Sequence, residues 1–501
     1  MTIVRMKVFA VLLGPSGIGL LSLYHSVMST VATVSAMGIA SSGVRQIAAA
    51  NGHEVRMANA LSALRLMTIV LGTVGALILF FLRNPVSVWM FGTHEHITPL
   101  AVLSIGVLCT IIYQSQTAIL NGLCRLTALA RINVIGSACG TIAAIILIWL
   151  FGEPAVVYSI VASVFIMLIC SSWFLRSVLR PSQGPCYSEV KKEMLSLLRL
   201  GSAFMGAGLM MTGALLFTRV IFLQQVGLDA TGQFQAAWGI AAIFIDFILT
   251  AMSMDFYPHL TDCIKRDHLA GHRLVNQQTE VALLLGGPLI MGMLMLADVM
   301  MRALYSTEFA AATELLRLLL LGNILKIASW PLGYLIIAHA WVKTWVFTEL
   351  VWASAYLSVV YLGCNYFGIN SAGYAFLVSY LIIVIILYSI TYKRAGFAWS
   401  RKNVRLIAAV GSAGILVAVL ASSENFGGYF LGGVITCIFA AVSLVRLSRM
   451  MDNESPALII QSIRKILVQT STDYPGFNKA DRGPRTDSPA NKHQASSTRP
   501  S

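Results

Sequence analysis

Two apolar stretches lie almost back to back in the first half of the chain: INVIGSACGTIAAIILIWLF (132–151) and PAVVYSIVASVFIMLICSSWFL (154–175). The hydrocarbon core of a bilayer is about 30 Å thick, and an α-helix needs about 20 apolar residues to cross it. Both stretches reach that length without a charged residue. The pair is therefore typical of two membrane-spanning helices joined by a short turn.

The same pattern repeats over residues 2–446. Apolar residues make up 57% of the chain and charged residues 11%, far from the proportions of soluble globular proteins. The length criterion predicts roughly fourteen helical spans, and hence an all-α polytopic membrane protein. Their approximate limits are 2–13, 18–40, 61–82, 99–120, 132–151, 154–175, 201–223, 233–256, 280–301, 315–338, 345–366, 370–391, 404–421 and 428–446.

Basic residues are concentrated in alternate connections between these spans. The connection after the sixth span includes Arg176, Lys191 and Arg199, whereas the opposite connections hold only Arg83 and Arg302. By the positive-inside rule, even-numbered spans end in the cytoplasm and both termini lie there. We therefore expect a multi-pass protein of the bacterial inner membrane. The net charge of +14 follows this loop pattern, so it predicts no nucleic-acid partner.

Two glycine-containing turns echo each other along the chain, LLGPSGIGLLSLYHS (12–26) and QQVGLDATGQFQAAWG (224–239). Each has a glycine, Gly17 or Gly232, just ahead of an even-numbered span. A repeat at a spacing of about six spans indicates a transporter built from two similar halves, with the pathway between them.

The predicted organisation follows from these observations. It comprises an N-terminal lobe at 1–176, a cytoplasmic inter-lobe loop at 177–200, a C-terminal lobe at 201–393, two extra spans at 394–447 and a cytoplasmic tail at 448–501. The polar composition of the tail predicts disorder, apart from an apolar patch at 457–468 that suits a short interfacial helix. The first stretch, 2–13, rises only about 20 Å as a helix. Either the natural chain begins further upstream or this helix is shortened.

Charged side chains inside spans are costly in a bilayer, so they usually mark a pathway or an ion pair. Lys326 and Asp246 lie near the middle of their spans, Arg219 and Glu349 lie nearer to span ends, and Arg45 follows the second span. Cations that line a cavity attract phosphorylated lipids, and the arginine fork binds phosphate with two hydrogen bonds. Arg45, Arg219 and Lys326 are therefore candidate contacts for an anionic substrate, and acids in the same cavity, such as Asp246 and Glu349, are candidates for ion coupling or charge pairing.

Each assignment has an alternative that the sequence leaves open. Lys326 and Asp246 can form a purely structural ion pair. Arg219 can extend its guanidinium to the lipid headgroups, and Arg45 can be an ordinary positive charge of a cytoplasmic loop.

The sequence contains no recognisable motif for nucleotide binding or metal binding. There is no P-loop, HEHITP (94–99) lacks the HExxH spacing of a zinc site, and the eight cysteines show no CxxC pair. We therefore expect no metal, no cofactor and no catalytic residue, and so no enzyme. A membrane glycan polymerase or acyltransferase stays as an alternative, although the predicted loops are short for an active site outside the membrane.

Four segments, taken in order, resemble one family of membrane proteins. The family is that of the Wzx-type flippases of O-antigen and enterobacterial common antigen, in the multidrug/oligosaccharidyl-lipid/polysaccharide (MOP) exporter superfamily. The resemblance covers roughly residues 5–395 and is carried by LLGPSGIGLLSLYHS (12–26), SAMGIASSGVRQIA (35–48), TGQFQAAWGIAAIFIDFILTAMSMDFYPHL (231–260) and EFAAATELLRLLLLGNILKIASWPLGYLIIAHAWVKTWVFTEL (308–350).

The resemblance implies two six-helix lobes around a cationic cavity, and export of an undecaprenyl-pyrophosphate-linked oligosaccharide by alternating access. It places substrate-binding cations at Arg45, Arg219 and Lys326, and acidic positions at Asp246 and Glu349. Implied partners are the lipid-linked oligosaccharide, membrane lipids, a coupling proton or sodium ion, and polysaccharide polymerase and chain-length proteins. A drug/cation antiporter of the same superfamily is the second alternative, and it would favour a cavity dominated by carboxylates.

Overall fold

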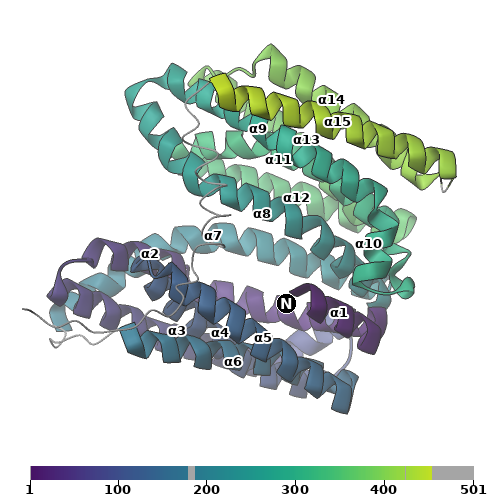
Figure 1. Ribbon diagram of the computed structural model, residues 1–501. Helices are drawn as coiled ribbons and strands as arrows, with labels where there is room; N and C mark the ends of the chain where they lie inside the picture. Colours follow the sequence, from purple (N-terminus) through teal and green to yellow (C-terminus); the bar gives the residue numbers. More distant parts are fainter. Residues whose placement is uncertain (1, 179–186, 424, 454–501) are drawn as a thin grey trace, which may run out of the picture. The chain divides into compact units, whose positions relative to one another are not determined.

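The computed structural model describes residues 2–178, 187–423 and 425–453, which form an array of long α-helices (Figure 1). No β-strand occurs in these residues. Eleven helical stretches of the described chain are long and apolar enough to cross a membrane. The expected all-α membrane fold is therefore confirmed, while the count of roughly fourteen spans stays a prediction.

A first group of helices comes from the N-terminal part of the chain. It contains α1 (Thr2–Ala36), α2 (Ile39–Ala50), α3 (Glu54–Phe91), α4 (Ile97–Gly122), α5 (Leu126–Phe151) and α6 (Val156–Val178). Consecutive helices pack side by side, α3 on α4 and α5 on α6, and α4 also packs on α6. Leu23, Leu100 and Leu103 are fully buried between them. Since lipid tails are as apolar as leucine, close packing holds these helices together more than the hydrophobic effect does.

The remaining helices form a second group. It contains α7 (Tyr187–Gln225), α8 (Leu228–Arg266), α9 (His268–Met295), the short α10 (Ala297–Leu304), α11 (Ala312–Ala338), α12 (Val342–Phe367), α13 (Ser371–Ala395), α14 (Arg401–Ser422) and α15 (Phe426–Asn453). α11 packs against α8, α9 and α13, and α9 also packs against α14 and α15. Of the candidate spans, α9 and α11 are the most enclosed by protein. A charged side chain on α11 is therefore surrounded mainly by other helices.

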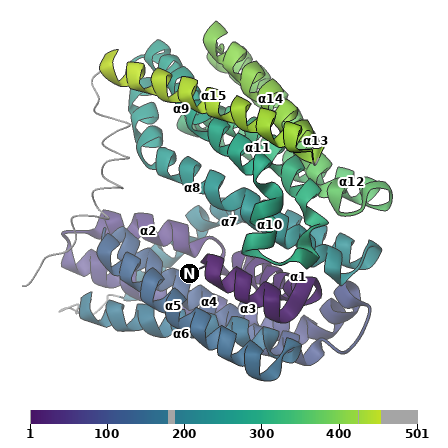
Figure 2. The same cartoon turned by 45° about the vertical axis from the view of Figure 1, so that its right-hand side comes forward.

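One sequence expectation changes in detail. α7 begins at Tyr187, so residues 187–200 are helical where the sequence predicted an inter-lobe loop. α7 packs against α1, α2 and α3 as well as α12, and both views show it between the two groups (Figures 1 and 2). The expected lobe boundaries stay a prediction. Residues 454–501, which include the proposed interfacial patch of the tail, lie outside the described residues.

α1 contains a sharp kink at Gly14. The backbone there has φ 64° and ψ −169°, a region that is essentially accessible to glycine alone. The short stretch predicted at 2–13 and the span predicted at 18–40 are thus joined through this kink. The kink folds the first segment of α1 back along the second, and this places side chains from the two segments next to each other.

The two echoing turns pack against each other. A Cβ on Gly232 of α8 would lie 2.7 Å from the carbonyl carbon of Pro15 and 3.0 Å from the backbone nitrogen of Gly19. A Cβ on Gly19 would in turn meet the backbone of Leu228 and Gly232. Only glycine permits this approach between α1 and α8. The turn of the second segment lies at Gly227, so Gly17 and Gly232 are inside helices rather than just ahead of them.

Candidate functional site

Lys326 and Asp246 form an ion pair between α11 and α8. The Lys326 Nζ donates a hydrogen bond to Asp246 Oδ1 at 2.5 Å. The lysine side chain is 22% exposed and the aspartate side chain 51% exposed, so the aspartate is the more accessible partner. The ion pair that the sequence left open as a structural alternative is therefore present.

Glu349 and Tyr380 lie beside this pair. The indole of Trp345, one turn earlier on α12, lies next to the Glu349 carboxylate. The Tyr380 side chain on α13 is within electrostatic range of both Glu349 and Asp246. Tyr380 thus relates the two predicted acidic residues across α8, α12 and α13. Within the described residues Asp246 is paired with Lys326, and no ion pair involves Glu349.

Arg219 is a buried cation on α7. It is 7% exposed, and its guanidinium donates to Gln235 Oε1 on α8 at 2.5 Å. The guanidinium carbon lies 5.8 Å from the centre of the Phe234 ring, a weak cation–π contact. Within the described residues no carboxylate pairs with Arg219, and its Nε has no hydrogen-bond partner. This burial argues against extension to the headgroups and leaves a cation that requires an anion.

Gln235 and Asp246 lie on the same face of α8, about three helical turns and 16 Å apart along the axis. Gly232 and Gly239 share this face. A Cβ on Gly232 would meet the Pro15 backbone of α1, and one on Gly239 would lie 3.5 Å from the Met6 side chain of α1. The face of α8 that carries Gln235 and Asp246 therefore points toward the first helix group instead of toward lipid.

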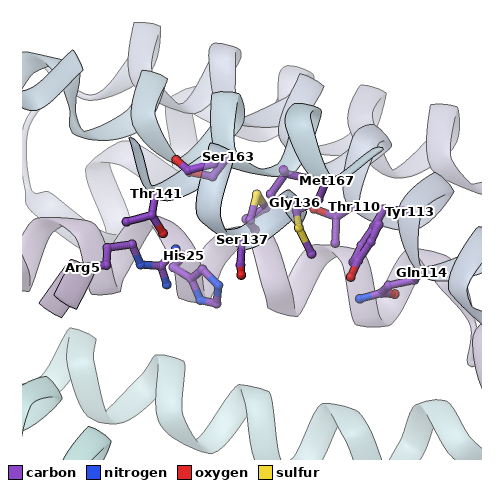
Figure 3. A pocket seen from close by; sticks show the side chains of 13 residues that line it. Arg5, His25, Thr110, Tyr113, Gln114, Gly136, Ser137, Thr141, Ser163 and Met167 are labelled. Atoms are coloured by element: carbon purple, nitrogen blue, oxygen red, sulfur yellow. The ribbon is translucent and has the colours of Figure 1, made fainter. Parts of the chain in front are cut away.

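A second cationic feature is a pocket of about 240 Å³ between α1, α4, α5 and α6. Arg5 and His25 lie side by side at one end, and Tyr113 and Gln114 lie at the other (Figure 3). The His25 side chain is open to solvent although protein atoms surround it closely, as expected for a group that lines a recess. Its imidazole is within electrostatic range of both Arg5 and Arg219. The two arginines supply the positive charge of this group, and we call the three residues the cationic cluster.

Sequence reasoning did not assign Arg5 or His25. Arg5 was visible as a charge inside the first apolar stretch, but that stretch is too short to span a bilayer alone. His25 lies eight residues after Gly17, in the motif that carried the family resemblance. The kink at Gly14 brings the two together, and a kink of this kind is not apparent from apolar periodicity.

Arg45 lies elsewhere. It is an exposed side chain on α2, and no hydrogen bond or ion pair within the described residues joins it to the cationic cluster or to Lys326. Its neighbour Gln46 contacts Glu193 of α7. The structure thus brings Arg219 together with Arg5 and His25, and Lys326 together with Asp246 and Glu349, and leaves Arg45 outside both sets.

The described residues contain no group of three or more His, Cys, Asp or Glu side chains suited to a metal ion. What they do contain is a set of membrane-spanning helices with charges gathered between the helices. This arrangement of charges suits the binding of anions and small ions between the helices. Fold and site define a multi-pass membrane transport protein.

Comparison with known proteins gives the family. Residues 8–314 match the family described as "Polysaccharide biosynthesis protein", and the chain belongs to that family. It is 22% identical to a lipid III flippase of Escherichia coli over 355 residues, which are 69% of this chain and 82% of the relative. A lipid III flippase of Shigella flexneri matches equally, at 22% identity over the same share of each chain.

Solved structures of MOP-superfamily transporters share the fold. An inward-facing multidrug-resistance MATE family transporter superposes with a TM-score of 0.64 at 15% identity, over 78% of this chain and 93% of the transporter. The lipid II flippase MurJ in an inward closed conformation has a TM-score of 0.64 at 13% identity, over 90% of this chain and 97% of MurJ. The expected helical fold is therefore shared with these transporters, and the similar proteins are named as flippases and transporters.

Proposed function

We propose that the protein is a flippase of the inner membrane that moves an undecaprenyl-pyrophosphate-linked oligosaccharide from the cytoplasmic to the periplasmic leaflet. The product would serve polysaccharide or lipopolysaccharide biosynthesis, including O-antigen, through polymerase and chain-length partners. The family match and the flippase relatives support movement of a lipid-linked sugar. The sugar, the carrier lipid and the partners rest on the resemblance in the motifs.

The observation that carries the proposal is the burial of Arg219 without a paired carboxylate among the described residues. Its guanidinium is 7% exposed, donates to one glutamine and has no carboxylate partner among the described residues. Burial of such a cation is unfavourable unless an anion binds to it. A diphosphate brings two or more negative charges and several acceptor oxygens, which match the donors of Arg219, Arg5 and His25. We assign substrate binding to this cluster and keep Arg45 and Lys326 as further substrate contacts.

Arg45 suits an early contact. By the predicted orientation α2 ends at the cytoplasmic surface, where the lipid-linked substrate is made. An exposed arginine there would meet the diphosphate at headgroup depth before the substrate reaches Arg219.

The ion pair of Lys326 and Asp246 supplies the proposed coupling. If a proton or sodium ion binds Asp246, Lys326 loses its partner and is free to contact the diphosphate. Tyr380 is within electrostatic range of both carboxylates, and we assign Glu349 a supporting role in the coupling. Release of the ion re-forms the pair and expels the phosphate. Ion binding and substrate binding are thereby linked through one lysine.

Alternating access requires contacts that close one end of the pathway. Gly19 and Gly232 provide a close backbone contact between α1 and α8. At the same end, the Lys7 Nζ donates to the carbonyl oxygens of Arg302, at 3.1 Å, and of Tyr305. In the predicted orientation this end faces the periplasm. We infer that these contacts form the periplasmic gate and that the described conformation has this gate closed.

A drug/cation antiporter is the main alternative, since the fold is shared with MATE transporters. Such a transporter needs a carboxylate available to an organic cation. Here Asp246 is paired with Lys326 and Glu349 is half-buried, whereas Arg219 is a buried cation with no carboxylate partner among the described residues. A glycan polymerase or acyltransferase is disfavoured by the transporter names of the similar proteins. The charge balance therefore favours the anionic lipid.

The test is complementation of a deletion strain of the native host. Without the protein, lipid-linked repeat units should accumulate in the cytoplasmic leaflet and surface glycan should fall. Wild type should restore export, and Arg219→Met and Lys326→Ala should not, although both are present in the membrane at wild-type level. A deletion strain with normal surface glycan and no accumulated intermediate, in a background cleared of redundant flippases, would refute the proposal.

A further inference from the structure

The pocket beside Arg5 and His25 has a polar wall that the function proposed above does not use. It is lined by residues of α1, α4, α5 and α6, including Thr110, Tyr113, Gln114, Ser137 and Thr141. Its volume of about 240 Å³ lies below the ~300–1,000 Å³ of pockets for drug-sized ligands. The pocket is thus large enough for a single small ring and too small for an oligosaccharide.

The wall has hydrogen-bonding capacity left over. Thr110 donates to the Gly106 carbonyl oxygen at 2.7 Å, and Ser163 to that of Ser159 at 2.7 Å, so both hydroxyl oxygens keep lone pairs that can accept. Among the described residues, the Gln114 amide and the Thr141 hydroxyl have no hydrogen bond. Gln114 can donate and accept at the same time. A ligand that carries several hydroxyl groups satisfies such a wall, and an acyl chain does not.

The floor and sides of the pocket are apolar. Met28, Val164 and Met167 line it together with the ring of Tyr113. Tyr113 is oriented by a hydrogen bond of 3.3 Å from its hydroxyl to Asn133 Oδ1. An aromatic ring and thioether carbons next to hydroxyls match a pyranose, which has C–H faces and a rim of hydroxyls.

The position of the pocket limits which sugar it can take. Arg5 and His25 stand at one end of it (Figure 3), and His25 is within electrostatic range of Arg219. In a polyprenyl-diphosphate-linked glycan, the first sugar is bonded directly to the terminal phosphate through its anomeric oxygen. When the cationic cluster holds the diphosphate, that first sugar is the part of the glycan that lies nearest to the pocket.

We propose that this pocket is a subsite for the phosphate-proximal sugar of the lipid-linked substrate. This inference rests on the proposed function and deepens it. The protein would select the first sugar, by hydrogen bonds from Gln114, Thr141 and Ser137, and would tolerate variation in the sugars that follow. Arg5 and His25 bind the adjoining phosphate, so one site recognises both the phosphate charge and the first sugar.

The inference is tested by binding of defined lipids to the purified full-length protein in nanodiscs. The probes are undecaprenol, undecaprenyl diphosphate, and undecaprenyl diphosphate carrying one N-acetylglucosamine, glucose or galactose. Wild type should bind at least one sugar-bearing lipid about tenfold more tightly than undecaprenyl diphosphate, as roughly two net hydrogen bonds allow.

Ser137→Leu fills the pocket and should remove that tenfold preference while leaving the affinity for undecaprenyl diphosphate unchanged. Gln114→Leu should reduce the preference in the same way. Cys139→Leu is the matched control, since Cys139 is an exposed residue of the same helix that does not line the pocket. It should keep the full preference.

The outcomes separate the two proposals. If no sugar-bearing lipid exceeds undecaprenyl diphosphate in wild type, or if Ser137→Leu retains the preference, the sugar subsite is overturned while the flippase proposal stands. If undecaprenyl diphosphate binds no better than undecaprenol, the cationic cluster is not a diphosphate site, and the proposed function itself fails.

Discussion

Replacement of Gly232 by alanine tests the close contact between α1 and α8. The added Cβ would lie 2.7 Å from the carbonyl carbon of Pro15 and closer still to its oxygen, whereas ordinary contact begins at 3.4 Å. The obstacle is backbone on both sides, so no side chain can rotate away. α1 and α8 must separate by at least about 0.7 Å, and overpacking of this kind costs about 1–3 kcal/mol.

This cost applies only to the conformation in which the two helices touch. Gly232→Ala should therefore shift the equilibrium toward the separated state by about five- to 150-fold. Gly239→Ala is the matched control. It lies on the same face of the same helix, and its added Cβ would make ordinary contacts at 3.4 Å and 3.5 Å.

Electron–electron distance measurements report the shift. Spin labels at Val11 and Val226, which are 63% and 46% exposed, sit on α1 and directly before α8. In a functional cysteine-free background, wild type and Gly239→Ala should show one dominant distance, and Gly232→Ala should show a longer second population that predominates. Export should also fall in Gly232→Ala. An unchanged distance distribution with full export in Gly232→Ala, at wild-type thermal stability, would refute the gate.

Three further substitutions follow from the charges and the kink. Arg219→Met should abolish export yet raise the stability of the substrate-free protein by about 1–4 kcal/mol, because it removes a buried cation without a counter-charge; thermal unfolding in detergent checks this, and a lower Tm would contradict it. Lys326→Met should lower the stability of the protein more than the double variant Lys326→Met/Asp246→Asn does, because the single change leaves the Asp246 carboxylate without its cation. A double-mutant cycle measures the coupling energy, and a coupling energy of the opposite sign would contradict this. Gly14→Ala should cost about 1–3 kcal/mol from backbone strain, and a Tm equal to wild type would show that the kink is relaxed.

The membrane class and the main charge pair could be predicted from the sequence. Apolar length alone identifies spans, because a bilayer sets that length, and Lys326 with Asp246 stood out because charges in spans are rare. The turn at 12–26 and its echo at 224–239 were identified as glycine turns, and the structure shows why, since the two pack together.

The remaining site residues could not be predicted, because their positions depend on tertiary geometry. Arg5 and His25 lie side by side only because α1 is kinked at Gly14. No local sequence motif marks either residue. Arg45 and Arg219 look alike in sequence as cations near span ends. One is exposed on α2 and the other is 7% exposed on α7, because burial is set by which helices pack around each position.

The most direct test of the central claim is transport in vesicles that contain only the purified protein. A fluorescent polyprenyl diphosphate carrying one sugar is placed in both leaflets, and a membrane-impermeant quencher reports movement under an imposed proton or sodium gradient. Wild type should move the lipid well above the rate of protein-free vesicles, and Arg219→Met should fall to that background while remaining folded. Wild type at the protein-free rate under both gradients, or Arg219→Met at the wild-type rate, would contradict the account.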